Sequence, residues 1–270
     1  NMLKNYDFLN VDTLVIDNFV FLPLINIIKY KKLIVRVTDR LEGFGVGAAA
    51  IKAEEYLIKK ADKVIYTSSN LKNYIEKFNK SCFYLPNGVD FNKFQKKYDK
   101  PDFFCTIAKP VAVYVGAIES WFDFDLLDYV ADELKDVHFL VIGAVKFKPN
   151  NFDQIQSREN VTFYGKVDNS LVASFLKFSD VGIIPFRLDM DLVHSISTLK
   201  LYEYSAAGLY TVATKWRELK QLNSPALLAK SKEDFVEYIK KSLDLNRGDK
   251  TKILNFAKDN DWKEKLQSII

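Results

Sequence analysis

The residues best suited to bind an anionic ligand lie between positions 197 and 203. Ser197 and Thr198 come directly before a helical pattern that runs from Leu199 to Ala207. They can cap this helix and direct its free backbone N–H groups toward a phosphate. Lys200 lies in the first turn, where a positive charge opposes the helix dipole. Because a bound anion would resolve that conflict, the pattern favours phosphate binding over an ordinary exposed lysine.

A carboxylate follows on the same face of this helix. Glu203 comes three residues after Lys200, and its oxygens can accept two hydrogen bonds from neighbouring hydroxyls such as those of ribose. The alternative is an exposed Lys200–Glu203 pair, worth only about 0.3 kcal/mol. Arg187, which follows a strand pattern at Ile184, could supply a second cation to the phosphate. An arginine on the surface explains it equally well.

Two glycines mark the ends of predicted strands in the same half of the chain. Gly143 ends one strand, and Gly165 ends the next and is followed by Lys166 and Val167. Glycine lets the backbone approach a ligand closely, so backbone groups here could bind the edge of a nucleotide base. Tight turns without a ligand account for the glycines equally well.

The elements that must position these residues alternate between β-branched runs and helical patterns. Buried strands are expected near residues 13–16, 33–37, 63–67, 111–116, 137–143, 161–165, 180–185 and 210–213. Helices are expected at 48–60, after a cap at Ser69, and at 199–207, where Gly208 ends the helix. Alternation of this kind predicts mostly parallel, doubly wound sheets and an α/β fold.

The alternation is interrupted once, which predicts the domain organisation. Residues 1–90 are expected to form an incomplete α/β domain of about three strands. Residues 91–109 are charged and flanked by prolines, and they are expected to form a linker. Residues 110–245 would form a complete domain of five or six strands, followed by a helical segment at 246–270. A sheet of three strands leaves apolar edges uncovered. We therefore expect that an upstream segment is absent or that the first domain is reduced.

Composition and motif content exclude several kinds of partner and cofactor. The net charge is only +4, and no nucleic-acid-binding motif is present, so no nucleic-acid partner is expected. Two cysteines and two histidines predict neither a disulfide framework nor a metal site, and no cofactor is expected. Without a signal peptide or membrane span, the prediction is a cytoplasmic protein. Lys29, Lys31 and Lys32 beside Tyr30 would allow weak attraction to an anionic membrane surface.

Several segments together resemble GT-B glycosyltransferases, in particular family-4-like and xanthan-glucuronosyltransferase-like enzymes. They are the helix and strand from Glu55 to Ser68, the PNGVD turn at 86–90, Ile184-Pro185-Phe186 with LKLYEY at 199–204 and AAG at 206–208, and Phe256-Ala257 with Asp261-Trp262. The resemblance implies two Rossmann-like domains and a C-terminal helix that crosses back to the first domain. It also implies a nucleotide-sugar donor, with Lys200 on its diphosphate and Glu203 on its ribose.

The sequence departs from its relatives at two places. Relatives often place an arginine and a lysine after the first strand of the second domain, where this chain has Ala117, Ile118 and Glu119, so Arg187 would replace that cation. Retaining relatives carry two glutamates eight positions apart, and Ser195 stands where the first would be. This favours an inverting transfer, which needs a base for the acceptor hydroxyl. Asp39 follows the strand Leu33–Val37, and ligands collect at the carboxyl ends of parallel strands. Asp39 is therefore the predicted base, although it could instead cap its loop or pair with Arg40.

The predicted function is the transfer of a sugar from a nucleotide-sugar to a hydroxyl of a glycan or lipid-linked acceptor. A UDP-sugar is the preferred donor, and a GDP-sugar is the next candidate. A non-catalytic nucleotide-sugar-binding subunit and a nucleotide-sugar 2-epimerase are the alternatives. The sequence leaves the oligomeric state open. Asp123, Asp125 and Asp128, which resemble a carboxylate cluster, are instead predicted to occupy the first turns of a helix.

Overall fold

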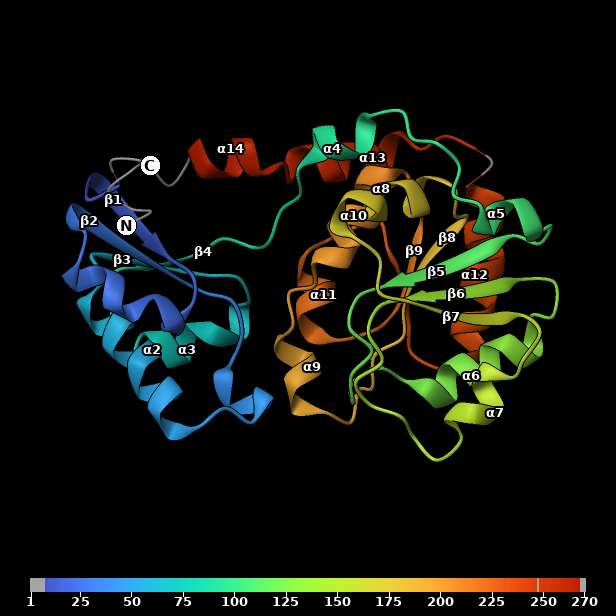
Figure 1. Ribbon diagram of the computed structural model, residues 1–270, viewed down its shortest axis with the longest axis horizontal. Coiled ribbons are helices and arrows are strands. Elements are labelled where there is room, and N and C mark those ends of the chain that lie inside the picture. The colour runs from blue at the N-terminus through green and yellow to red at the C-terminus, as the bar shows by residue number, and fades with distance from the viewer. Residues whose placement is uncertain (1–7, 247, 268–270) are drawn as a thin grey trace. The chain divides into compact units, whose positions relative to one another are not determined.

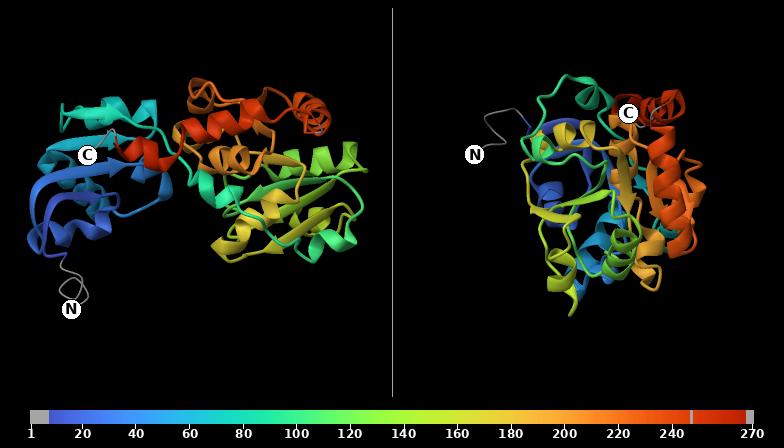
Figure 2. Two further views of the ribbon diagram at one scale, coloured as in Figure 1. Left: turned by 90° about the horizontal axis from the view of Figure 1, so that it is seen from above. Right: turned by 90° about the vertical axis from the view of Figure 1, so that its right-hand side faces the viewer.

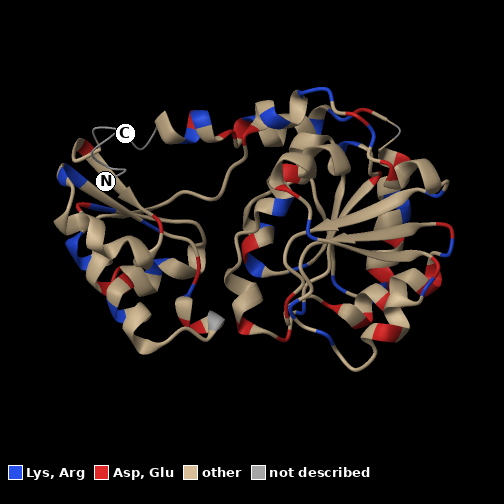
Figure 3. Ribbon diagram, viewed as in Figure 1, with Lys and Arg blue, Asp and Glu red and all other residues tan. Residues whose placement is uncertain are grey.

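The computed structural model describes residues 8–246 and 248–267, which form two compact units, each built on a parallel sheet (Figures 1 and 2). The first unit contains the described residues up to Asn87 together with His194–Ser197. The second contains Gly88–Val193 and the described residues from Thr198 onward. Acidic and basic residues alternate along the helices of both units (Figure 3).

The sheet of the first unit has four parallel strands in the order β1-β2-β3-β4. They are β1 (Asn10–Ile16), β2 (Lys29–Val37), β3 (Lys63–Tyr66) and β4 (Cys82–Tyr84). The connections hold η1 (Phe19–Asn26), η2 (Leu41–Phe44), α2 (Ala48–Lys60), η3 (Ser69–Leu71) and α3 (Lys72–Ile75). Leu33, Val35 and Ile58 are central to its apolar core. The unit is thus one strand larger than expected.

The second unit has six parallel strands in the order β10-β9-β8-β5-β6-β7. They are β5 (Val111–Val115), β6 (His138–Ile142), β7 (Val161–Gly165), β8 (Val181–Ile184), β9 (Thr211–Thr214) and β10 (Leu227–Ala229). The chain order along the sheet reverses between β8 and β5. In open α/β sheets, the carboxyl ends of strands at such a reversal are where ligands bind.

Helices cover both faces of this second sheet (Figure 1). The helices of the chain from Phe91 onward are α4 (Phe91–Gln95), α5 (Phe103–Thr106), α6 (Phe124–Glu133), α7 (Phe152–Gln156), α8 (Asn169–Lys177), α9 (Asp191–Ser195), α10 (Leu199–Ala207), α11 (Arg217–Gln221), α12 (Lys232–Leu245), α13 (Thr251–Asp259) and α14 (Trp262–Gln267). On one face α6 packs on α12, and on the other α10 packs on α8 and α13. The fold is therefore the predicted doubly wound α/β type.

Local sequence signals explain several boundaries. The predicted helices at 48–60 and 199–207 match α2 and α10 residue for residue, and Gly208 ends α10 in the left-handed region at φ 79°. The predicted cap at Ser69 is wrong. Ser68 has the extended backbone that a capping residue needs, and a 3-10 turn already begins at Ser69.

The segment 91–109, expected to be a linker, carries α4 and α5 and belongs to the second unit. Phe94 and Phe104 bury their rings there. The same unit contains a parallel bridge between Val89 and Asp261, and the Trp262 N–H donates to the Val89 carbonyl at 2.9 Å. The predicted crossing of the last helix to the first domain remains a prediction.

Candidate functional site

Three neighbouring strands of the second unit end in glycine at the carboxyl edge of the sheet. Gly116 follows β5, Gly143 follows β6 and Gly165 ends β7, with φ values of 146°, 150° and 84°. The Gly143 N–H donates to the Gly165 carbonyl at 2.8 Å. A Cβ atom on Gly143 would lie 1.8 Å from the Gly116 carbonyl oxygen. The ends of β5 and β6 are therefore packed so closely that position 143 has no room for a side chain.

Open space lies beside the last of these glycines. A Cβ atom added to Gly165 would meet no atom within 4 Å among the described residues. Lys166 is exposed and Val167 is half-buried in the loop that follows. Gly143, Gly165, Lys166 and Val167 therefore share one edge of the sheet, with open space beside Gly165 and with the Gly143 N–H already bonded to the Gly165 carbonyl.

Lys200 lies beside this glycine edge. Its Nζ atom is 5.0 Å from the centre of the Tyr114 ring and 5.4 Å from that of Phe186. A Cβ atom on Gly116 would come within 2.7 Å of Nζ, so glycine is what leaves room for the ammonium. Burial lowers the pKa of Lys200 to about 8. Within residues 8–246 and 248–267, no carboxylate lies within 4 Å of Nζ. An enclosed cation without a carboxylate partner is suited to bind an anion.

The helix that carries Lys200 begins as predicted. Thr198 is the N-cap of α10, and its hydroxyl accepts the Lys200 N–H at 3.3 Å. Glu203 is half-buried, and burial raises its pKa, an effect that the positive charges of Lys200 and Lys93 oppose. Lys200 and Glu203 thus interact through space without forming the exposed pair that was the alternative interpretation.

Ser197 belongs structurally to the first unit. Its carbonyl accepts a hydrogen bond from the Asn87 amide at 2.5 Å, and Asn87 in turn accepts one from Arg36. The Ser197 hydroxyl is buried and has no hydrogen-bond partner in the described part of the chain. Thr198 is therefore grouped with Lys200 in the second unit, whereas Ser197 is held by Asn87.

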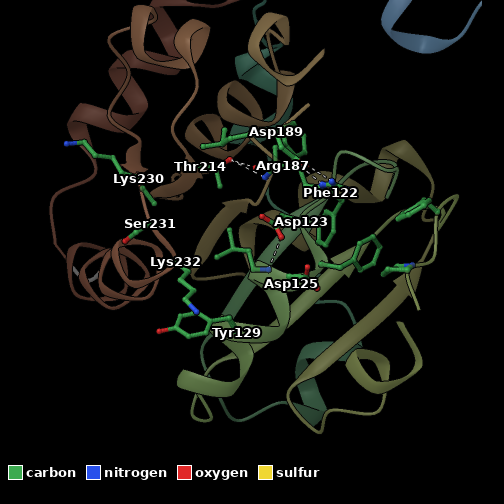
Figure 4. A pocket seen from close by; sticks show the side chains of 17 residues that line it. Phe122, Asp123, Asp125, Tyr129, Arg187, Asp189, Thr214, Lys230, Ser231 and Lys232 are labelled. Atoms are coloured by element: carbon green, nitrogen blue, oxygen red, sulfur yellow. Dashed lines mark hydrogen bonds and ion pairs between the residues drawn. The ribbon is translucent and has the colours of Figure 1, made fainter. Parts of the chain in front are cut away.

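Arg187 is already paired. Its guanidinium forms a two-point ion pair with Asp189, with N–O distances of 2.5 and 3.1 Å. Both residues line a cavity of 590 Å³ whose lining contains neither Lys200 nor Glu203 (Figure 4). The arginine that the sequence offered as a second phosphate cation is neutralised by its neighbour. Asp123 caps α6 by accepting the Leu126 N–H at 2.8 Å, as predicted for an acidic first turn.

The first unit carries titratable groups beyond the end of β2. Asp39 is half-buried, and burial raises its pKa while the Thr38 hydroxyl and the Arg36 charge oppose the shift. Arg40 does not pair with Asp39. It bonds to Glu42, and its guanidinium lies 4.0 Å from the centre of the Tyr74 ring. The Asp39–Arg40 pair, which was the alternative to a catalytic role, is therefore not formed.

Glu54 is a buried acid that the sequence analysis missed. Tyr74 donates a hydrogen bond to its carboxyl at 3.1 Å, and burial raises the pKa of Glu54 to about 7. A signal was present, because Glu54 falls on the same helical stripe as Leu57, Ile58 and Ala61. A charged residue at a core position of an amphipathic helix indicates either a buried partner or a function.

Two further expectations concern metals and membranes. In the described part of the chain, no three His, Cys, Asp or Glu side chains are grouped to hold a metal ion. None of the helices within 8–246 and 248–267 is long and apolar enough to cross a bilayer. Of the three clustered lysines, Lys31 is exposed and pairs with Asp12 at 2.7 Å.

Two units built on parallel sheets, the second with glycine at three strand ends, are the architecture of the GT-B fold. Residues 109–244, just over half of the chain, match the family model described as glycosyl transferases group 1. The chain belongs to this family and is a transferase enzyme.

Solved structures support the fold. Sucrose-phosphate synthase from Thermosynechococcus elongatus is 12% identical with a TM-score of 0.70, over 99% of this chain and 73% of that one. HepE from Anabaena in complex with UDP-glucose is 14% identical with a TM-score of 0.71, over 96% of this chain and 77% of HepE. A glycosyltransferase from Rickettsia africae is 15% identical with a TM-score of 0.66, over 99% of this chain and 76% of that enzyme. A comparison with curated proteins finds no match.

Proposed function

We propose that the enzyme transfers a sugar from a UDP-sugar to a hydroxyl group of a glycan or lipid-linked acceptor. The observation that carries this proposal is Lys200, an enclosed ammonium that has no carboxylate partner among the described residues, on the helix that Thr198 caps. A diphosphate would satisfy both the ammonium and the free N–H groups of the first turn.

The rest of the nucleotide fits the neighbouring residues. Glu203 is one turn further along α10, where its carboxylate can accept bonds from the ribose hydroxyls. The open backbone at Gly165, with Lys166 and Val167, would receive the base edge. HepE, similar in fold, has been solved with UDP and with UDP-glucose, which supports uracil as the base to test first.

We assign the role of general base to Asp39. In an inverting transfer, the acceptor oxygen attacks the anomeric carbon and its proton passes to a base, while the bond from that carbon to the diphosphate oxygen breaks. Burial raises the pKa of Asp39, which makes its carboxylate a stronger proton acceptor. The negative charge that develops on the departing diphosphate would be stabilised by Lys200.

Calorimetric titration with UDP, uridine and GDP tests the donor site. Lys200→Ala should weaken UDP binding by about 1.5–3 kcal/mol, the scale of a charge-assisted hydrogen bond, or about 10- to 150-fold. It should leave uridine binding unchanged, because uridine has no phosphate. Glu203→Ala should weaken UDP and uridine alike. Lys220→Ala, an exposed lysine of the same unit, is the matched control.

The proposal fails if no nucleoside diphosphate binds, or if Lys220→Ala weakens UDP as much as Lys200→Ala. Equal effects of Lys200→Ala on UDP and on uridine would remove the phosphate assignment specifically. Release of UDP from UDP-sugars, measured with and without lipid-linked and free glycan acceptors, then tests the transfer itself.

A cytoplasmic location at the inner membrane surface is part of the same proposal, since a lipid-linked acceptor would be presented there. Lys29 and Lys32 are the cations available, because Lys31 is paired with Asp12. Their contribution should be about 1 kcal/mol each. Flotation with vesicles containing phosphatidylglycerol should therefore decrease in Lys29→Ala/Lys32→Ala, and unchanged flotation would exclude this patch.

A further inference from the structure

The second unit holds a cavity of 590 Å³ that the proposed donor site does not use (Figure 4). Segments that follow β5, β6, β8 and β10 contribute to its lining, as does Thr214, the last residue of β9. It therefore lies at the carboxyl edge of the sheet, where β5 and β8 adjoin. Phe186 is the connection to the donor site, since its ring lies near Lys200 and also lines the cavity.

The charges around the cavity balance. The acids that line it are Asp123, Asp125 and Asp189, and the bases are Arg187, Lys230 and Lys232, three of each sign with a formal sum of zero. Arg187 and Asp189 neutralise each other directly. The net field thus favours neither a polyanion such as a nucleotide nor a polycation.

Polar groups nevertheless line opposite walls, where Asp125 accepts one bond from the Asn151 amide and the Ser231 hydroxyl accepts the Asp234 N–H. Figure 4 shows Asp123 and Asp125 at the start of α6, with Lys230, Ser231 and Lys232 on the wall formed by the start of α12. Asp123 uses one oxygen to accept the Leu126 N–H, which leaves the second for a ligand. Carboxylates accept hydrogen bonds from hydroxyls and ammonium groups donate them.

The remaining surface is aromatic. Phe122 and Phe186 are buried in the wall, and their backbones pair in an antiparallel bridge that fixes it. Phe147 also lines the cavity and is 39% exposed. An aromatic ring left open to solvent can pack against the apolar C–H face of a ligand.

We propose that this cavity is a binding subsite for a neutral saccharide, distinct from the nucleotide site. A neutral sugar combines hydroxyls, which suit the carboxylate and ammonium groups, with C–H faces, which suit Phe147. The volume lies within the range of about 300–1,000 Å³ that is usual for small-molecule sites. The subsite would hold part of a glycan that carries neither the nucleotide nor the reacting hydroxyl.

The experiment is a ligand-observed NMR titration of the full chain with maltose, cellobiose, lactose and chitobiose. At least one disaccharide should bind saturably, and saturating UDP should not displace it. Phe147→Ala should weaken the binding at least 5-fold, and Asp125→Asn should weaken it as well. Phe21→Ala, which removes a ring that is 49% exposed in the first unit, should have no effect.

Absence of saturable binding by all four disaccharides would overturn the proposal. Complete displacement by UDP would also overturn it, because the cavity would then belong to the donor site. An equal loss in Phe147→Ala and Phe21→Ala would show non-specific contact. Since the saccharide titration does not need UDP to bind, its result is independent of the donor proposal, and circular dichroism of each variant verifies the folding of both units.

Discussion

The two units carry groups of opposite charge beyond the carboxyl ends of their strands. In the first, acids accumulate beyond β2, and burial raises the pKa values of both Asp39 and Glu54. In the second, three strand ends carry glycine, and the enclosed charge beside them is the cation Lys200, which we propose binds phosphate. A backbone surface with one ammonium suits a fixed anion, whereas buried acids suit the uptake of a proton. The same layered architecture thus provides two sites of different chemistry.

The largest effect should come from Gly143→Ala. The new methyl would collide with the Gly116 carbonyl, and alanine would have to adopt φ 150°. Overpacking and backbone strain together should cost about 3 kcal/mol in the free energy of unfolding. Trp121, Trp216 and Trp262, the three tryptophans of the chain, all lie in the second unit, so urea unfolding followed by tryptophan fluorescence reports this unit.

Two glycine controls separate collision from strain. Gly165→Ala has open space but φ 84°, and should lose only about 1–2 kcal/mol. Gly47→Ala, in the first unit, has neither restriction and should leave the tryptophan transition unchanged. Similar losses at Gly143 and Gly165 would mean that the close packing of strand ends has no energetic role.

Asp39→Asn tests whether the buried acid Asp39 of the first unit accepts a proton during the transfer. It retains the shape of the side chain and removes its basicity, so turnover should fall about 100-fold, or about 2.7 kcal/mol in activation free energy. UDP affinity should remain intact. In the unmodified enzyme, activity should decline as the pH falls through the raised pKa of Asp39. Near-normal turnover of the variant, or a product that keeps the anomeric configuration of the donor, would contradict this role.

Glu54→Gln should stabilise the first unit in a pH-dependent manner. The folded pKa of about 7 lies above the ordinary value of 4.5, so the stability of the wild-type protein falls as pH rises from 4.5 through 7. The full shift corresponds to about 3 kcal/mol, and partial solvation should reduce it to about 2 kcal/mol. Glutamine keeps the bond from Tyr74 without a charge. The variant should therefore be more stable at pH 8 and equal to wild type near pH 4.5.

Cys82 provides the measurement, because it lies half-buried in β4 of the first unit. Samples equilibrated in urea at each pH receive a brief thiol-labelling pulse at one common pH, and the Cys82 peptide is quantified by mass spectrometry. Cys105, exposed in the second unit, is the internal standard. A gain that is the same at pH 5 and pH 8 would rule out ionisation as its cause.

The smallest effect is expected from Thr198→Ala. Loss of an N-cap typically costs about 1 kcal/mol, and the same loss is expected in Ser231→Ala, because Ser231 caps α12. UDP affinity should fall a few-fold in Thr198→Ala only, since that cap orders the turn that carries Lys200. If both variants weaken UDP binding equally, the α10 cap has no specific role in nucleotide binding.

Features set by local sequence were predictable, and features set by tertiary partners were not. The β-branched run at 33–37 and the Gly208 helix end are visible without a structure, as is the conflict of Lys200 with its helix dipole. By contrast, the strand Leu227–Ala229 has only three residues and no β-branched side chain. The Arg187–Asp189 pair depends on the loop conformation, and the Glu54–Tyr74 bond joins residues 20 positions apart. The sequence therefore indicated the proposed phosphate-binding cation directly, whereas for the buried acid of the first unit it offered only a position on an apolar stripe and not its partner Tyr74.

The bridge between Val89 and Asp261 has a consequence for synthesis of the chain. Its two residues are 172 positions apart, and a Cβ atom at the adjacent Gly88 would lie 2.6 Å from the Asn260 carbonyl. Contacts of such separation form late, because a long loop must close first. On the ribosome, the opening segment of the second unit must therefore wait until residues 260–262 have emerged. We expect its exposed apolar side chains to need protection from aggregation during that interval.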